Sequence, residues 1–289
     1  MSHRNSEDEK EDSSQAEVQQ GAVQQHVNAH FDSTATYWDG VYRGDSLQGV
    51  IYQDRQAAVL DYVDAAALQS ESRVLEIGCG AGHLTMELAE RGLRVDAVDA
   101  SPAMVDAAAG RAAERGLSQR VTVGVADVHA LPFGSSEFDL VVAVGLIPWL
   151  HSPDSAVREM ARVLRPGGQL VLTADNRARL VSFTDPRAML ALSPLKRVLV
   201  ALRRRRGKAT SRLDSPRTID RLLLQSALRP LERRTVGFGP LSFMGWMFLG
   251  EARSIRVNGR LQALANRGTP GLRWTGWHYL VHAKKPSGP

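Results

Sequence analysis

The segment that decides the fold reads Val74-Leu75-Glu76-Ile77-Gly78-Cys79-Gly80-Ala81-Gly82. The apolar run that ends at Ile77 predicts a buried strand, and residues 82–91 predict a helix. Glycine at every second position of the loop between them permits a tight turn and close approach of a ligand to the backbone. The free N–H groups at the start of the helix lie beside that turn. We therefore expect a ligand-binding loop between this strand and this helix.

Outward from this segment, short apolar runs alternate with amphipathic stretches. Strands are expected at residues 73–77, 94–98, 121–125, 138–144 and 169–173, and helices at 53–67, 102–115 and 154–164. The run from Phe138 to Val144 is continuously apolar apart from Asp139, which predicts burial on both faces. Strands that alternate with helices imply right-handed crossovers and a mostly parallel sheet, so the predicted fold class is α/β.

Beyond residue 173 the alternation is less regular. Residues 188–206, 216–227 and 241–264 look helical, and residues 233–238 and 277–284 look like strands. At the other end, residues 28–42 predict a helix with an aromatic face. Residues 1–26 are polar and acidic with few apolar side chains, so we expect them to be disordered.

The glycine loop is compatible with two classes of cofactor. Dinucleotide-binding proteins use Gly-x-Gly-x-x-Gly, but the sixth position of this loop is His83. Glu76 precedes the loop, where a carboxylate is unfavourable beside a pyrophosphate and favourable beside an amino group or a sulfonium. Asp99 stands at the end of the next predicted strand, where its carboxylate can accept from both ribose hydroxyls. Ser101 already provides the cap of the helix that follows, which leaves Asp99 for a ligand.

Five motifs in order resemble class I methyltransferases that depend on S-adenosylmethionine (SAM), most closely the ubiquinone/menaquinone-biosynthesis-like group that acts on small molecules. The resemblance spans about residues 50–175 and is loose over 177–289. It implies a Rossmann-like, seven-stranded sheet with helices on both faces and helical insertions in the C-terminal part. The motifs are Val74–Gly82, Val95–Val105, Ala126-Asp127 with Leu131-Pro132-Phe133, Phe138–Val142 and Arg162–Leu172.

The resemblance also implies a set of cofactor-binding residues. Glu76 would hold the amino group of SAM, Asp99 the ribose hydroxyls, and Asp127 the adenine amino group, while the Val128 N–H binds the adenine ring. Ala100 and Met104 would pack beside adenine. The other implied contacts are Gly78, Gly80 and Gly82 along the methionine part, Val144 with Gly145 closing that side, and Tyr37 with Tyr42 as a lid over the site.

Catalytic candidates are few. His151 follows the fourth predicted strand, at the edge where such sheets bind ligands, and is the expected general base. His129 is a second histidine near the adenine side, with a solvated role favoured. Trp149 stands where many relatives have a histidine, and could wall the acceptor pocket or belong to the core. For Arg55 a surface ion pair is favoured over the methionine carboxylate. No metal is expected.

The charge distribution is uneven. Residues 177–289 contain 23 Lys and Arg against 5 Asp and Glu, whereas residues 1–176 contain 13 against 26. A basic half suits an anionic substrate, a membrane surface or nucleic acid. Lys196–Arg206 alternates apolar and basic residues and predicts a peripheral membrane contact. A solvated arginine face or a packed helical cap is the simpler alternative.

The segment Gly145-Leu146-Ile147-Pro148-Trp149 lacks the Asn/Asp-Pro-Pro-Tyr/Phe element of many nucleic-acid amino-methyltransferases, so nucleic acid is not the expected partner. The single cysteine, Cys79, excludes an intramolecular disulfide. The first 20 residues have no apolar signal-peptide region, and a cytoplasmic, membrane-peripheral location is expected.

The expected organisation is an acidic tail over 1–26 and one methyltransferase domain over 27–289. Its core covers residues 50–175, with substrate-side helical insertions at about 177–228 and 239–272. The expected function is transfer of a methyl group from SAM to the oxygen or carbon of a small, apolar or anionic acceptor. The alternatives are a nucleic-acid-modifying methyltransferase and a SAM-binding protein without turnover.

Overall fold

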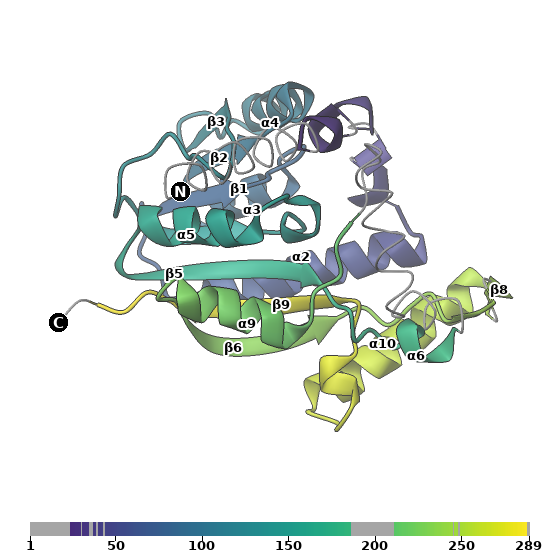
Figure 1. Cartoon of the computed structure of the whole chain (residues 1–289). Coiled ribbons are helices and arrows are strands. Elements are labelled where there is room, and N and C mark those ends of the chain that lie inside the picture. Colours follow the sequence, from purple (N-terminus) through teal and green to yellow (C-terminus); the bar gives the residue numbers. More distant parts are fainter. Residues whose placement is uncertain are drawn as a thin grey trace, which may run out of the picture.

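One seven-stranded sheet forms the centre of the molecule in this computed structural model (Figure 1). The structure describes residues 24–29, 31–34, 37–38, 40–42, 44–185, 211–244, 246–247 and 249–287. The strand order is β3-β2-β1-β4-β5-β9-β6, and only β9 runs antiparallel to its neighbours in this sheet. The predicted α/β class and the mostly parallel sheet are therefore confirmed.

The elements match the predicted alternation up to β5. The strands are β1 (Arg73–Ile77), β2 (Arg94–Asp99), β3 (Val121–Val125), β4 (Phe138–Ala143), β5 (Leu164–Asp175), β6 (Arg229–Val236), β7 (Ser242–Phe243), β8 (Trp246–Met247) and β9 (His278–Lys284). The helices are α2 (Leu47–Ala65), α3 (His83–Glu90), α4 (Pro102–Glu114), α5 (Pro153–Val163), α6 (Val181–Thr184), α9 (Pro216–Gln225) and α10 (Glu251–Asn266), with short 3₁₀ turns η1 (Ile147–Trp149) and η2 (Leu272–Trp274).

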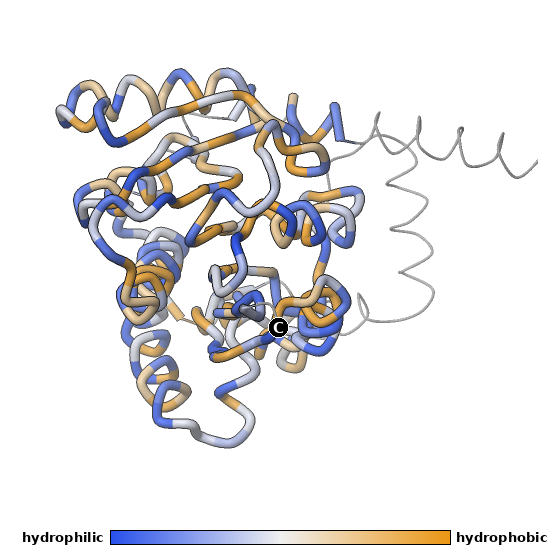
Figure 2. Tube along the Cα trace, turned by 90° about the vertical axis from the view of Figure 1, so that its left-hand side faces the viewer, coloured by the Kyte–Doolittle hydropathy of each residue, from blue (hydrophilic) through white to orange (hydrophobic). Residues whose placement is uncertain are grey.

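The sheet separates two apolar cores. Alternate side chains of β1 point to opposite faces, so Val74 lies in one core and Leu75 in the other. Helices α2, α3 and α4 cover the first face, while α5 and α9 cover the second, in front of the sheet in Figure 1. Figure 2 shows hydrophilic and hydrophobic residues alternating along the helices, as expected for helices with one buried face. This double cover explains why β4 is buried from Leu140 to Ala143.

Local capping explains where α4 begins. The Ser101 hydroxyl accepts a hydrogen bond from the Met104 N–H at 3.2 Å, and Pro102 occupies the first turn, as its fixed φ favours. The predicted cap is confirmed. Because Ser101 caps the helix, the Asp99 side chain does not serve as the cap and remains at the end of β2.

The largest difference from the prediction lies at residues 241–264, which were expected to be largely helical. The structure has a short antiparallel hairpin, β7–β8, and α10 starts only at Glu251. Met244 has a φ of +53° in the turn, and Gly250, in extended conformation, is the N-cap of α10. The apolar side chains of this segment do not follow a helical period, and Trp246 is 80% exposed.

Two other predictions fall at the edge of the described residues or outside them. Residues 24–26, at the end of the expected disordered tail, are helical. The Lys196–Arg206 segment, with its predicted membrane contact, lies outside the described residues. Within the part of the chain that the structure describes, no helix is long and apolar enough to cross a membrane.

Candidate cofactor and acceptor site

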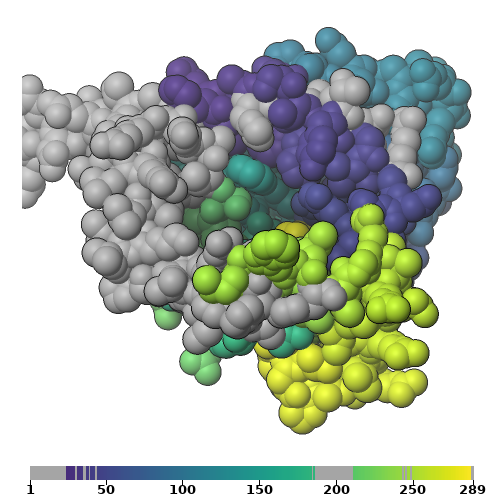
Figure 3. Space-filling model, turned by 90° about the vertical axis from the view of Figure 1, so that its right-hand side faces the viewer, coloured from purple at the N-terminus to yellow at the C-terminus, as the bar shows by residue number. Residues whose placement is uncertain are grey.

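A cavity of about 190 Å³ lies at the carboxyl edge of the sheet, where β1, β2, β4 and β5 end. Open parallel sheets bind ligands at this edge. Figure 3 shows a hollow between N-terminal residues, in purple, and residues of the C-terminal part, in green. The cavity is lined by the glycine loop, by residues after each of these strands, and by aromatic side chains from residues 31–52 and from η1.

The glycine loop turns tightly below this cavity. Gly78 and Gly80 have φ values of +73° and +53°, a region that side-chain-bearing residues rarely adopt, and both line the cavity. The N–H groups of Gly78 and Cys79 donate to the Val98 carbonyl at 2.8 and 3.1 Å, which anchors the loop to β2.

Gly82 has a packing role that the sequence did not predict. It has a φ of +79° but does not line the cavity. A Cβ at this position would lie 2.9 Å from the Ala108 Cβ of α4, so glycine is needed for the packing of α3 on α4. The predicted contact of Gly82 with the cofactor stays a prediction.

Glu76 is the most buried acidic group of the cavity, with 3% of its surface exposed. Its carboxylate accepts a hydrogen bond from the Thr85 hydroxyl at 2.6 Å. Burial raises the pKa of Glu76 to about 8, the Thr85 hydrogen bond opposes the shift, and the nearby Asp99 adds to it. When a cation enters the cavity, the buried Glu76 carboxyl gains an oppositely charged partner that stabilises its ionised form.

Asp99 ends β2, Asp127 follows β3, and both line the same cavity. Asp99 accepts from the N–H groups of Gly80 and Ser101, both at 2.9 Å, while burial raises its pKa. Asp127 accepts from the N–H and the ring Nδ1 of His129 at 2.9 and 2.7 Å, and the ring hydrogen bond lowers the pKa of Asp127. The three carboxylates thus stand at the ends of three adjacent strands.

The remaining predicted cofactor residues divide into two groups. Ala100, Met104, Val128 and Val144 line the cavity with the carboxylates. Tyr37 does not, and it is 57% exposed. Tyr42, the other predicted lid residue, does line the cavity.

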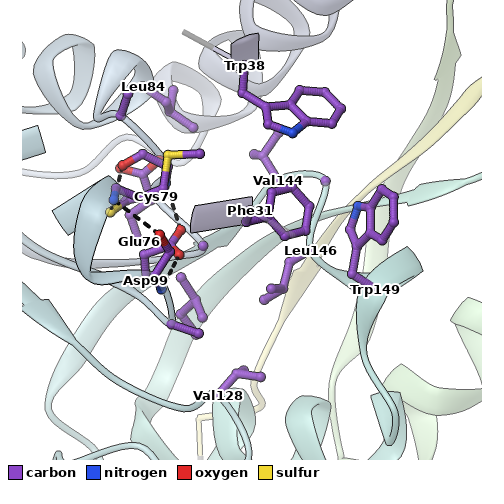
Figure 4. A pocket seen from close by; sticks show the side chains of 18 of the residues that line it. Phe31, Trp38, Glu76, Cys79, Leu84, Asp99, Val128, Val144, Leu146 and Trp149 are labelled. Atoms are coloured by element: carbon purple, nitrogen blue, oxygen red, sulfur yellow. Dashed lines mark hydrogen bonds between the residues drawn. The ribbon is translucent and has the colours of Figure 1, made fainter. Parts of the chain in front are cut away.

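Aromatic side chains form the wall opposite the glycine loop (Figure 4). Phe31 packs edge-on against Trp149 with ring centroids 5.1 Å apart, and its ring lies 5.9 Å from that of Trp38. The Trp38 Nε1 is buried and has no hydrogen-bond partner among the described residues. Trp149 therefore belongs to the cavity wall, one of the two roles that the sequence left open.

Arg55 is buried in the same wall, with 4% of its surface exposed. Its guanidinium donates to the Tyr42 hydroxyl at 2.6 Å and lies 4.5 Å from the centre of the Tyr52 ring. Among the described residues it has no acidic partner within 4.0 Å, and its Nε is buried without a partner. The preference for a surface ion pair at Arg55 was wrong, because α2 turns this side chain toward the cavity.

His151 is not among the residues that line the cavity. Its ring packs against the His129 ring at a tilt of 35°, with centroids 3.9 Å apart, and its Nδ1 lies 3.1 Å from the Gln24 side-chain oxygen. Burial and the neighbouring His129 lower the pKa of His151. A general-base role for His151 stays a prediction, and its position beside the adenine-side residues does not favour it.

Sequence reasoning missed Asp175, which ends β5 and lines the cavity. The signal was present, because Asp175 follows an apolar strand as Asp99 does. Sequence reasoning also missed Phe31 and Trp38 as wall residues of the cavity, although it expected an aromatic helix face there.

Comparisons with known proteins agree with this geometry. Residues 74–168 match the methyltransferase domain family. A ubiquinone biosynthesis O-methyltransferase of Xanthomonas oryzae pv. oryzae (strain PXO99A) is 36% identical over 119 residues, which are 41% of this chain and 49% of the relative. The chain thus spans about half the length of the curated relatives it matches.

Solved structures share the whole fold at low sequence identity. Magnesium protoporphyrin IX methyltransferase from Synechocystis PCC 6803, with bound SAH, has a TM-score of 0.62 at 17% identity, covering 90% of this chain and 98% of that one. The [4+2]-cyclase SpnF has a TM-score of 0.62 at 21% identity, covering 91% and 96%. Residues 74–168 therefore match a methyltransferase domain, and the fold around them is the one found in solved methyltransferases such as the SAH-bound Synechocystis protein.

Proposed function

We propose that this protein transfers a methyl group from SAM to a small-molecule acceptor by in-line displacement. One observation carries the proposal: Glu76, Asp99 and Asp127 line one cavity in the order of the strands, and the cavity continues past them to an aromatic wall. SAM is a cation with an amino group, a ribose and an adenine, and each of these has a matching acceptor along that row.

We assign each part of SAM to residues of the cavity. Glu76 receives the amino group, Asp99 the ribose hydroxyls, and Asp127 the adenine amino group, with the Val128 N–H on the ring. Gly78 and Gly80 let the methionine part approach the backbone. Further contacts are assigned to Ala100 and Met104 beside adenine and to Val144 on the methionine side.

Arg55 completes this placement. Its buried guanidinium lies on the methionine side of the cavity, where a Cβ at Gly145 would be 3.1 Å from the Arg55 Nη1. A buried guanidinium without a carboxylate partner is costly, and a bound carboxylate relieves that cost. We assign the methionine carboxylate of SAM to Arg55.

The reaction needs alignment more than it needs covalent help from the protein. The methyl group of SAM is electrophilic because it is bonded to a positively charged sulfur. Holding the nucleophile, the methyl carbon and the sulfur in line contributes up to roughly 10 kcal/mol. The wall of Phe31, Trp38 and Trp149 excludes water from the methyl side of the cavity and provides a surface for the acceptor.

An apolar, ring-containing acceptor fits that wall best. Phe31, Trp38 and Trp149 favour stacking and edge contacts with planar groups. The unpartnered Nε1–H of Trp38 offers a hydrogen bond to one polar atom of the acceptor. The protein similar to this chain that is named for ubiquinone biosynthesis supports a ring-containing acceptor by analogy. Membrane contact through Lys196–Arg206 stays a prediction.

Two measurements test the proposal. Calorimetry should show SAM and SAH binding, and incubation with tritium-methyl SAM and a protein-free metabolite extract should place label in small molecules. Binding without SAH formation would contradict the proposed transfer and favour a SAM-binding protein without turnover. The cyclase with the same fold makes this control necessary, because the fold alone does not determine the reaction.

A further inference from the structure

Four acidic side chains among the described residues line the cavity, and the proposed function uses three of them. The fourth is Asp175, at the carboxyl end of β5. Strand β5 lies beyond β4, on the side of the sheet away from β2 and β3, where the ribose and adenine are assigned. Asp175 therefore stands at the opposite end of the cavity from Asp127, on the side left for the acceptor.

His278, the first residue of β9, holds this carboxylate in place. Strands β5 and β9 pair in antiparallel register with Asp175 opposite His278, and the His278 Nδ1 lies 3.1 Å from the Asp175 Oδ1. The His278 side chain is 3% exposed, and its Nε2 is buried with no partner among the described residues. The ring also packs against Tyr52 and Trp277, with centroids 5.6 and 5.7 Å away.

The charges around His278 favour its neutral form. Burial lowers the pKa of His278, the positive charges of Arg55 and Arg179 lower it further, and Asp175 opposes them. A neutral imidazole facing a carboxylate must donate its Nδ1–H, because a lone pair there would repel the oxygen. The Asp175 Oδ1 is thus occupied by His278.

The second oxygen of Asp175 has no hydrogen-bond partner among the described residues. Among the described residues the only hydrogen bond of this carboxylate is the one from His278, and the side chain is 18% exposed. Arg179 lies close enough for its positive charge to act on Asp175, yet its Nε is buried without a partner, and its guanidinium lies over Trp277. No side chain in the described part of the chain makes a hydrogen bond or ion pair with the Asp175 Oδ2.

We propose that Asp175 is the catalytic residue that accepts the hydrogen of the acceptor, and that His278 is its positioning residue. The inference rests on the proposed methyl transfer and specifies its acceptor as a hydroxyl-bearing molecule. The acceptor oxygen forms a bond to the methyl carbon, the carbon–sulfur bond breaks with its electron pair on sulfur, and the hydroxyl proton passes to the Asp175 carboxylate. A carbon nucleophile offers no such O–H donor, so the pair favours O-methylation.

The test uses sinefungin, a SAM analogue in which a carbon bearing an ammonium replaces the methylated sulfur. That ammonium occupies the position of the transferred methyl group and points toward the acceptor side. If Asp175 faces this position, Asp175→Asn should weaken sinefungin binding by about fivefold or more in calorimetry and change SAH binding by less than about twofold. Equal effects on both ligands, or no effect on either, would overturn the assignment.

Variants of His278 test the positioning role. His278→Gln keeps an N–H donor for Asp175 and should retain most of the preference for sinefungin. His278→Phe keeps the ring and removes the donor, so it should lose that preference while SAH still binds. Unchanged SAH affinity shows that each variant is folded, and Asp175→Asn carries the test alone if His278→Phe does not fold. The matched control is Asp154→Asn, which removes an exposed carboxylate of α5 that pairs with Arg158.

An activity measurement separates this inference from the proposed function. If wild-type protein labels a metabolite, Asp175→Asn should lower the rate at least about tenfold at saturating SAM, because a base is lost without loss of cofactor. Wild-type rates in Asp175→Asn would overturn the inference and leave methyl transfer intact. Failure of the wild-type protein to bind SAH would instead contradict the proposed function itself.

Discussion

The carboxylate of Asp99 accepts a hydrogen bond from the N–H of Gly80 at 2.9 Å, which ties the end of β2 to the centre of the glycine loop. The same side chain accepts from the Ser101 N–H. Asp99 thus both shapes the cofactor loop and presents a carboxylate to the cavity, so its replacement should affect binding more than one lost contact would.

Asp99→Ala should weaken SAM binding by about 100-fold, because it removes the proposed ribose contacts and releases the Gly80 N–H. Calorimetric titration with SAM and SAH measures the effect. Asp96→Ala is the control on the same strand, since Asp96 pairs with Arg73 away from the cavity. Normal SAM affinity in Asp99→Ala would remove the ribose assignment.

Glu76 should couple SAM binding to proton release. With a pKa of about 8 the unliganded carboxyl is mostly protonated at pH 7, and the incoming amino group favours the ionised form. Calorimetry at pH 7 should therefore give heats that depend on the ionisation enthalpy of the buffer. Glu76→Gln should bind SAM more weakly and lose this dependence. Buffer-independent heats in the wild type would refute the coupling.

The same residue should make stability depend on pH. The pKa of Glu76 in the folded protein, about 8, lies above the ordinary value of 4.5, so the folded state binds this proton more tightly than the unfolded chain does. Stability from this group is present below pH 4.5 and is lost as pH rises toward 8. Unliganded Glu76→Gln should therefore melt higher than wild type at pH 8, by a few degrees, with the difference shrinking at pH 5. A constant difference across this range would argue against the raised pKa.

Gly82→Ala should destabilise the protein by about 1–3 kcal/mol, because the new Cβ meets Ala108 and the backbone is left-handed. Urea denaturation measures the change. The control is Gly110→Ala, in the helix that contains Ala108: a Cβ there meets nothing within 4 Å, so stability should stay equal or rise by up to about 1 kcal/mol. Equal stabilities of the two variants would contradict the packing role of Gly82.

Arg55→Met should reduce the affinity for SAM by roughly 10- to 100-fold through loss of the charge-assisted contact with the methionine carboxylate. Decarboxylated SAM lacks that group, so its affinity should differ little between the variant and the wild type. Arg158→Met, on the exposed side of α5, is the control. Equal losses for both ligands would assign Arg55 a purely structural role.

Local sequence patterns were enough to predict the strand–loop–helix unit and the places of Glu76, Asp99 and Asp127 at the strand ends. These depend on local features: apolar periodicity, glycine spacing and the rule that parallel strands end at one edge. For the same reason β1, β3 and α9 began where predicted. The expected helix at 241–264 was confirmed from Glu251 onward and wrong before it, because apolar side chains without a helical period do not define a helix.

The proposed acceptor side of the cavity could not be predicted from local patterns. Asp175 and His278 are 103 residues apart and meet because β9 pairs antiparallel with β5. Phe31 and Trp149 meet only after the N-terminal residues fold over the sheet edge. The burial of Arg55 follows from the packing of α2 against that edge. Contacts between residues so far apart depend on the register and packing of whole elements, which local sequence patterns do not specify.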